Sequence, residues 1–180
     1  MEEKVRFILR TLAAYCLGIF LYILFHELGH TIVMLFAGSK ITEFSIIKAH
    51  VSCEGGYYTI NTHMWKNVNG ALLPLLLSYV FALSYNKSNF NRFYKIISMA
   101  VCLGPAFSLV AWIIIPVLFL LEIAPANDDV TQFLFYFTRG LGYSPLIVSG
   151  VAFLLLGVSI YFFYKRDILN GVAEMKKEKE

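Results

Sequence analysis

Charged residues are scarce in this chain: Asp, Glu, Lys and Arg make up only 15% of its 180 residues, whereas 58% are hydrophobic. A soluble domain usually carries about 25% charged residues, so this composition excludes an ordinary soluble globular protein. The net charge is only +3, and the basic residues lie between apolar runs, which argues against a nucleic-acid-binding surface. We therefore expect a polytopic membrane protein that is surrounded by the lipid bilayer and has no nucleic-acid partner.

Cysteine is also rare, with only Cys16, Cys53 and Cys102 present. An odd number of cysteines without a Cys-x-x-Cys spacing excludes a disulfide framework and a cysteine-based zinc site. We interpret the three as small core residues. Internal repeats and domain linkers are absent as well, so we predict a single integral-membrane domain over residues 1–180.

Four apolar segments are long enough to be transmembrane helices, at about 20 residues per crossing: residues 5–37, 68–84, 96–121 and 142–164. Between the first and second, residues 41–63 are rich in β-branched and aromatic side chains, with Gly55-Gly56 at the middle. This pattern predicts a small β-hairpin, with an ordinary loop outside the membrane as the alternative. A short amphipathic stretch is expected at residues 130–137. The predicted fold class is an all-α polytopic membrane protein with about four transmembrane helices and this hairpin.

Basic residues are distributed unevenly about the four predicted spans. If the N-terminus defines one side, eleven of the fifteen Lys and Arg residues lie on that side, and the other four are Lys40, Lys48, Lys66 and Arg139. Cytoplasmic loops carry the excess of Lys and Arg, so we predict a multi-pass protein of the cell membrane with both termini in the cytoplasm. The end of the first span and the loop after the third then lie together on the external side.

The first apolar segment contains His26-Glu27-Leu28-Gly29-His30 near its end. Residues four apart on a helix lie one turn apart on the same face, so both imidazoles can bind one metal ion. Glu27 then lies beside the ion without being a ligand. Two His ligands, an open position for water and a carboxylate that takes the proton of that water are the arrangement of a zinc hydrolase. Alternatively, neighbouring helices satisfy each group separately, which requires three polar partners in an apolar segment.

A catalytic zinc ion usually has three protein ligands, so a third is sought on the same side. The candidates are His50, Glu54, His63, Glu122, Asp128 and Asp129. The Asp pair is favoured because it follows Asn127 at the start of a helix-like stretch. One of the two carboxylates can cap that helix while the other binds the metal.

Several features of the chain together resemble the site-2 protease family of intramembrane zinc metalloproteases. They are His26-Glu27-Leu28-Gly29-His30, Ala37-Gly38, the hairpin with Gly55-Gly56-Tyr57-Tyr58-Thr59, a span that starts with Asn69-Gly70, and a later loop with Asp. The resemblance covers about residues 20–135 and is greatest to short, minimal members. It implies a three-helix catalytic core, His26 and His30 as zinc ligands, Glu27 as general base, a loop Asp as third ligand, and a membrane-associated hairpin that presents the substrate.

The chain departs from the pattern of that family in three places. The usual Gly-Pro-x-x-Asn motif appears as Gly70-Ala71-Leu72-Leu73-Pro74, with a closer match at Gly104-Pro105-Ala106-Phe107-Ser108 one span later. The usual Asp-Gly is replaced by Asp128-Asp129-Val130. Asp129 stands directly before the apolar position, as the family's Asp does, and is therefore the expected ligand, with Asp128 as the alternative. Many relatives place zinc toward the cytosol, whereas the charge distribution here places it outside.

The predicted function is hydrolysis of peptide bonds in membrane-embedded or membrane-proximal substrates. A zinc-activated water, with Glu27 as general base, would attack a carbonyl exposed by local unwinding of a substrate helix. The partners are a membrane protein or peptide as substrate and a regulatory membrane partner that the sequence does not identify. The alternatives are a non-proteolytic membrane protein that binds metal for structure or transport and a membrane-anchored zinc protease that cuts soluble peptides. A transporter should show inverted repeats or polar residues through several spans, and the sequence has neither.

Overall fold

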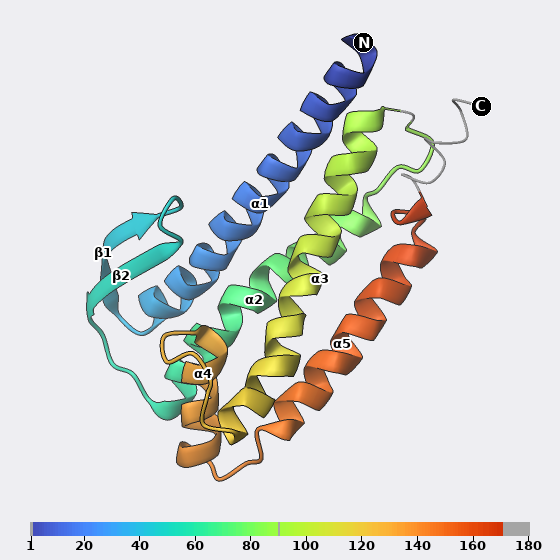
Figure 1. The fold of residues 1–180 in the computed structure, drawn as a ribbon. Coiled ribbons are helices and arrows are strands. Elements are labelled where there is room, and N and C mark those ends of the chain that lie inside the picture. The colour runs from blue at the N-terminus through green and yellow to red at the C-terminus, as the bar shows by residue number, and fades with distance from the viewer. Residues whose placement is uncertain (1, 90, 171–180) are drawn as a thin grey trace.

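Four long helices lie side by side in the computed structural model, which describes residues 2–89 and 91–170 (Figure 1). They are α1 (Glu2–Phe36), α2 (Ile60–Leu83), α3 (Arg92–Leu120) and α5 (Leu146–Lys165). Successive helices run in opposite directions, so the start of α1 and the end of α5 lie at the same end of the bundle (Figure 1). All four are long and apolar enough to cross a membrane, which is consistent with a multi-pass membrane protein.

The second helix begins at Ile60, so the prediction that it starts at residue 68 is wrong. Thr59 caps this helix, and its hydroxyl accepts a hydrogen bond from the backbone N–H of Thr62 at 3.2 Å. The first turns of α2 carry polar side chains, including Lys66 and Asn67, and hydropathy alone does not recognise such turns as helical. The polarity of Lys66 is explained by its position, because it lines the cavity of the candidate site.

The other helix boundaries differ less from the prediction. Helix α3 begins at Arg92 instead of residue 96, because the side chain of Asn91 accepts hydrogen bonds from the first backbone N–H groups. Helix α5 begins at Leu146 instead of residue 142, after Pro145 and a glycine with positive φ at Gly142. Helix α1 ends at Phe36, one residue before the predicted end, and Gly38, with φ of +82°, follows it where a glycine commonly ends a helix.

The predicted hairpin is present as two antiparallel strands, β1 (Ser39–Ser45) and β2 (His50–Gly55). It ends at residue 55, not 63, and residues 46–49 make its turn. Gly55 and Gly56 therefore close the second strand rather than lying at the middle of the hairpin. Both have positive φ, and a Cβ at Gly56 would lie 2.2 Å from the Ser39 hydroxyl oxygen, so glycine allows the chain to turn back against β1.

Helices α1 and α2 touch through their backbones beside the His pair. A Cβ at Gly29 would lie 2.2 Å from the carbonyl oxygen of Asn69. Any residue larger than glycine at this position would therefore clash with α2 unless the two helices moved apart. The Asn69 side-chain amide donates to the carbonyl of Gly29 at 2.7 Å. This close contact brings the face of α1 that carries the imidazoles against the start of α2.

The segment after α3 forms a short helix, α4 (Asp129–Leu134), which continues as the π-helical turn η1 (Phe135–Gly140). The predicted stretch of residues 130–137 is therefore helical and extends further. Val130 and Leu134 are buried against α2, α3 and α5 in a cluster completed by Ala71, Trp112, Ile115 and Ala152. This apolar anchor holds the start of α4, and hence the Asp pair, over the end of α1.

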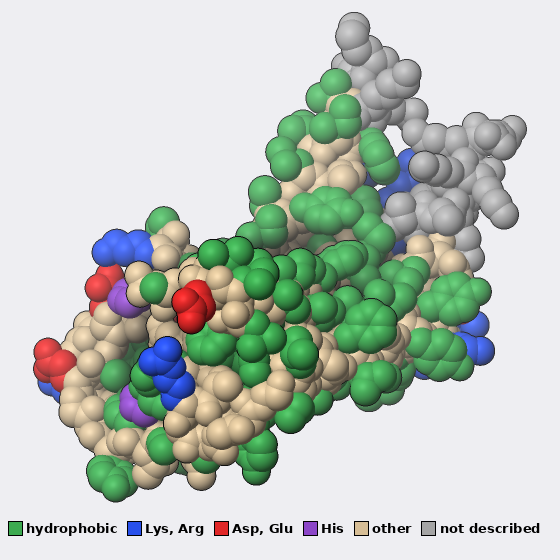
Figure 2. Space-filling view, turned by 60° about the horizontal axis from the view of Figure 1, so that its bottom comes forward, with side chains coloured by type: hydrophobic (Ala, Val, Ile, Leu, Met, Phe, Trp, Pro, Cys, Tyr) green, Lys and Arg blue, Asp and Glu red, His purple; other side chains and the backbone are tan. Residues whose placement is uncertain are grey.

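Acidic and His side chains on this face gather at the end of the molecule that carries the hairpin and α4, Lys and Arg lie at both ends, and hydrophobic side chains cover the length of the bundle (Figure 2). Many of these large apolar side chains are exposed, for example Ile8 at 62%, Leu154 at 68% and Tyr161 at 62% of their surface. A lipid environment would bury such side chains without cost. The polar end would then lie at one membrane boundary.

Candidate metal centre

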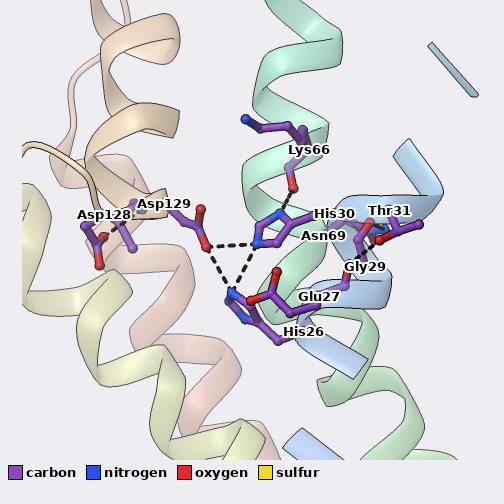
Figure 3. Close-up of polar contacts among 10 residues, drawn as sticks. His26, Glu27, Gly29, His30, Thr31, Lys66, Asn69, Asp128 and Asp129 are labelled. Atoms are coloured by element: carbon purple, nitrogen blue, oxygen red, sulfur yellow. Dashed lines mark hydrogen bonds and ion pairs between the residues drawn. The ribbon is translucent and has the colours of Figure 1, made fainter. Parts of the chain in front are cut away.

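Three side chains from two distant segments converge at the polar end of the bundle. His26 and His30 come from α1, and Asp129 comes from the first turn of α4 (Figure 3). The His26 Nε2, His30 Nε2 and Asp129 Oδ2 atoms form a triangle in which each edge measures 3.1 Å. Within the described part of the chain, this is the group of His, Cys, Asp and Glu residues that could hold a metal ion.

A backbone carbonyl determines which nitrogen of His30 is free. The Nδ1 atom of His30 lies 2.8 Å from the carbonyl oxygen of Lys66, which can only accept, so Nδ1–H is the donor. In the neutral imidazole, Nε2 then carries a lone pair that faces the other two atoms of the triangle. At 3.1 Å, the carboxylate oxygen and the imidazole nitrogens attract one another when a proton or a metal ion lies between them. The three atoms could hold a metal ion, and the Lys66 carbonyl would then anchor the second nitrogen of one ligand.

The His rings pack closely against α2. A Cβ at Gly70 would lie 2.6 Å from the ring of His30 and 2.9 Å from that of His26, so glycine is required for the imidazoles to occupy their positions. His30 is almost completely buried, and the buried Nδ1 of His26 has no hydrogen-bond partner among the described residues. The rings are thus held by packing as well as by the Lys66 carbonyl.

The two neighbouring carboxylates perform different tasks. Asp128 is the N-cap of α4, and its Oδ1 accepts from the backbone N–H of Val130 at 2.8 Å. Asp129 instead faces the imidazoles. Burial would raise the pKa of the Asp129 carboxyl, but the contacts with His26 and His30 outweigh it and hold this pKa below its usual range. The carboxylate is ionised, which is the form that binds a cation.

Glu27 lies next to the triangle without being part of it. Its side chain is only 3% exposed, and its carboxylate is beside the imidazole pair (Figure 3). A cavity of about 640 Å³ opens over this group, and Glu27 lines it together with His26, His30 and Asp129. The site therefore has room for a molecule larger than water, with a carboxylate beside the candidate metal position.

The other predicted third ligands do not join the triangle. His50 lines the cavity, but its Nε2 is hydrogen-bonded to the Ser52 hydroxyl at 2.7 Å. The ring of His63 is stacked between the rings of Tyr58 and Tyr136, at centroid distances of 5.1 Å and 4.5 Å. Glu54, in β2, and Glu122, after the end of α3, are exposed at the surface.

Sequence reasoning did not identify the parts of the site that act through the backbone. The carbonyl of Lys66 orients His30, and the Gly29 carbonyl is bound by Asn69. A carbonyl is common to every residue, so no residue type signals such a role.

Comparisons with family models, with curated proteins and with solved structures find no match to this chain.

Proposed function

We propose that this chain is an intramembrane zinc metalloprotease that hydrolyses peptide bonds of membrane-embedded or membrane-proximal substrates. The observation that carries the proposal is the triangle of His26 Nε2, His30 Nε2 and Asp129 Oδ2, which opens into a cavity lined by Glu27. The resemblance of residues 20–135 to the site-2 protease family supports the same function independently of the Asp129 geometry.

The donor set fits zinc. Two neutral imidazoles and one carboxylate are a known ligand set of catalytic zinc sites, and they leave a fourth position open. With ligands about 2.0–2.1 Å from a tetrahedral zinc ion, the ligand atoms are about 3.3 Å apart. The 3.1 Å edges of the triangle are close to that spacing. Only a small adjustment of the side chains is needed.

In the proposed reaction, His26, His30 and Asp129 would hold a zinc ion, which would supply Lewis-acid chemistry by lowering the pKa of water and polarising the peptide carbonyl. Glu27 accepts the proton of the attacking water and then donates it to the amine of the leaving fragment, so it serves as general base and then as general acid. His26, His30 and Asp129 act as ligands. Asp128 acts indirectly, because its cap on α4 positions the neighbouring Asp129.

The first experiment measures metal. Purified in detergent, the wild-type protein should contain about one zinc ion per chain, because a single three-donor site is present in the described residues. The His26→Ala, His30→Ala double variant should contain almost none, as two of three ligands are lost. Metal analysis by mass spectrometry checks both, and unchanged zinc in the double variant contradicts the proposed site.

We also propose that the bundle is inserted in the cell membrane with both termini in the cytoplasm. The support is the excess of Lys and Arg at the end of the bundle where α1 starts and α5 ends. Reporter fusions placed after Lys95 and Lys165 should then read as cytoplasmic, and one after Asp129 as external. The opposite readings would place the metal centre toward the cytosol.

A non-proteolytic metal-binding role is the alternative function. It predicts the same zinc content but no dependence of any cleavage on Glu27, so the Glu27 variant separates the two functions.

A further inference from the structure

One basic side chain belongs to the cavity of the metal centre. Lys66 is the single Lys or Arg among the described residues that line this cavity, and its side chain extends from α2 on the side of the site where Asp129 lies (Figure 3). Its backbone carbonyl is the group that accepts from His30. The base of the Lys66 side chain is therefore held at a fixed place relative to the two His ligands.

The charge of Lys66 has no counter-ion among the residues that the structure describes. Ion pairs in the described part of the chain join Asp129 to the imidazoles, Lys48 to Glu43 and Lys87 to Asp167, and none of them includes Lys66. Of the other basic residues at this end of the bundle, Lys48 contacts Glu43 at 2.9 Å and the Arg139 guanidinium lies over the ring of Phe135. Lys40, in β1, also has no ion pair among the described residues, but it does not line the cavity. Lys66 is thus distinguished by its position in the cavity together with its lack of an ion pair in the described part of the chain.

The carboxylates that share the cavity are already engaged. Asp129 faces the imidazoles, Asp128 caps α4, and Glu27 is the proposed base. The remaining polar side chains of the lining include the amides of Asn127 and Gln132, which can donate hydrogen bonds but carry no charge. An ammonium group that lines a cavity and has no ion pair is stabilised by an incoming anion. The cavity is therefore suited to a ligand with a negative group a short distance from the metal position.

We infer that Lys66 binds a carboxylate of the peptide substrate close to the scissile bond, and so selects acidic sites of cleavage. This inference rests on the proposed proteolytic function. Two sources supply the same group: an Asp or Glu side chain beside the scissile bond, or the α-carboxylate at the C-terminus of a peptide cut near its end. Lys66 is a specificity-determining residue in this role, whereas Glu27 performs the proton transfer.

The test uses the full-length, zinc-loaded protein in detergent and a set of quenched fluorescent hydrophobic peptides. Each position near the cleavage site carries Glu, Gln or Lys in turn, and each peptide is made with a free and with an amidated C-terminus. If Lys66 binds an acidic side chain, the wild type should cleave one Glu peptide with a higher kcat/KM than the matching Gln peptide. If it binds a terminal carboxylate, the free-acid peptide should be cleaved with a higher kcat/KM than the amidated one. In either case the expected ratio is roughly ten- to a hundredfold, the effect of one hydrogen bond to a charged group.

Two variants of Lys66 complete the design. Lys66→Gln should bring kcat/KM for the Glu and Gln peptides, or for the free-acid and amidated forms, to the same value. Zinc analysis of the same preparation reports whether the metal site, to which Lys66 contributes only its backbone carbonyl, is intact. Lys66→Glu should favour the Lys peptide over the Glu peptide, if a side chain is recognised. Lys48→Gln is the matched control, since that ammonium lies on the exposed hairpin and pairs with Glu43, and it should keep the wild-type preference.

The outcomes separate this inference from the proposed function. If wild type cleaves the Glu, Gln and Lys peptides and both terminal forms equally, the inference is wrong while the protease function stands. A preference that persists in Lys66→Gln likewise overturns it. If the zinc-loaded wild type cleaves none of the peptides, the proposed function and the inference are both overturned.

Discussion

Replacement of Glu27 by Gln is expected to leave zinc bound and to lower peptide cleavage by at least roughly 10²-fold, the usual contribution of a general base. The substitution preserves the size and the helix propensity of the side chain but removes its ability to take a proton. Glu27 is buried beside the imidazole pair and is not part of the triangle of candidate ligands. The Glu27→Gln variant should therefore retain its zinc and lose its activity. Zinc analysis and a fluorescent peptide assay on the same preparation measure both quantities.

The control for this variant is Glu54→Gln, a change of the same type at an exposed position in β2 that does not line the cavity. It should keep full activity and full zinc content. Loss of zinc in Glu27→Gln would instead make Glu27 a ligand. Normal cleavage in Glu27→Gln would assign the proton transfer to another group or support the non-proteolytic alternative.

The second large effect is expected from Asp129→Asn. Asn keeps the shape of the side chain but supplies a neutral amide in place of a carboxylate, so the only charged ligand among the three is lost. We expect weak zinc retention and almost no cleavage. Zinc content after dialysis against a mild chelator, together with the peptide assay, measures the two losses, which should occur together because the metal and the activity depend on the same oxygen atom.

The neighbouring Asp128 provides the matched control. Its side chain caps α4 through the Val130 N–H, and Asn caps a helix as well as Asp does, so Asp128→Asn should stay largely active. Asp128→Ala should cost about 0.5–2 kcal/mol of stability, which a thermal denaturation curve reports. A reversed pattern, with Asp128→Asn inactive and Asp129→Asn active, would exchange the two roles. Full activity in both variants and in the double variant would remove α4 from the site.

The sequence predicted the parts of the fold that depend on local patterns. Apolar segments near the length of a bilayer crossing indicated the four long helices, and β-branched and aromatic residues indicated the hairpin. Both kinds of signal depend on residues close together in the chain. The start of α2 was missed for the same reason, because Lys66 and Asn67 are polar where the helix meets the candidate site, and polarity there reflects tertiary surroundings rather than the end of the helix.

The pairing of His26 with His30 is likewise a local property, since any helix places residues four apart on one face. The sequence by itself therefore determined the two imidazoles and the neighbouring carboxylate of Glu27. It also placed the Asp pair at the same end of the bundle, through the number of spans. The residue types alone left the choice between Asp128 and Asp129 open, because the two differ by a single position, and only the resemblance to the site-2 protease family favoured Asp129.

Tertiary structure decided that choice. The burial of Val130 and Leu134 sets the rotation of α4, so that Asp129 faces α1 while Asp128 turns back to cap its own helix. The contact between Gly29 and α2 brings the Lys66 carbonyl to His30 and selects the free nitrogen of that ring. Both depend on the packing of segments far apart in the chain, and no local pattern of residues records how such segments are oriented when they meet.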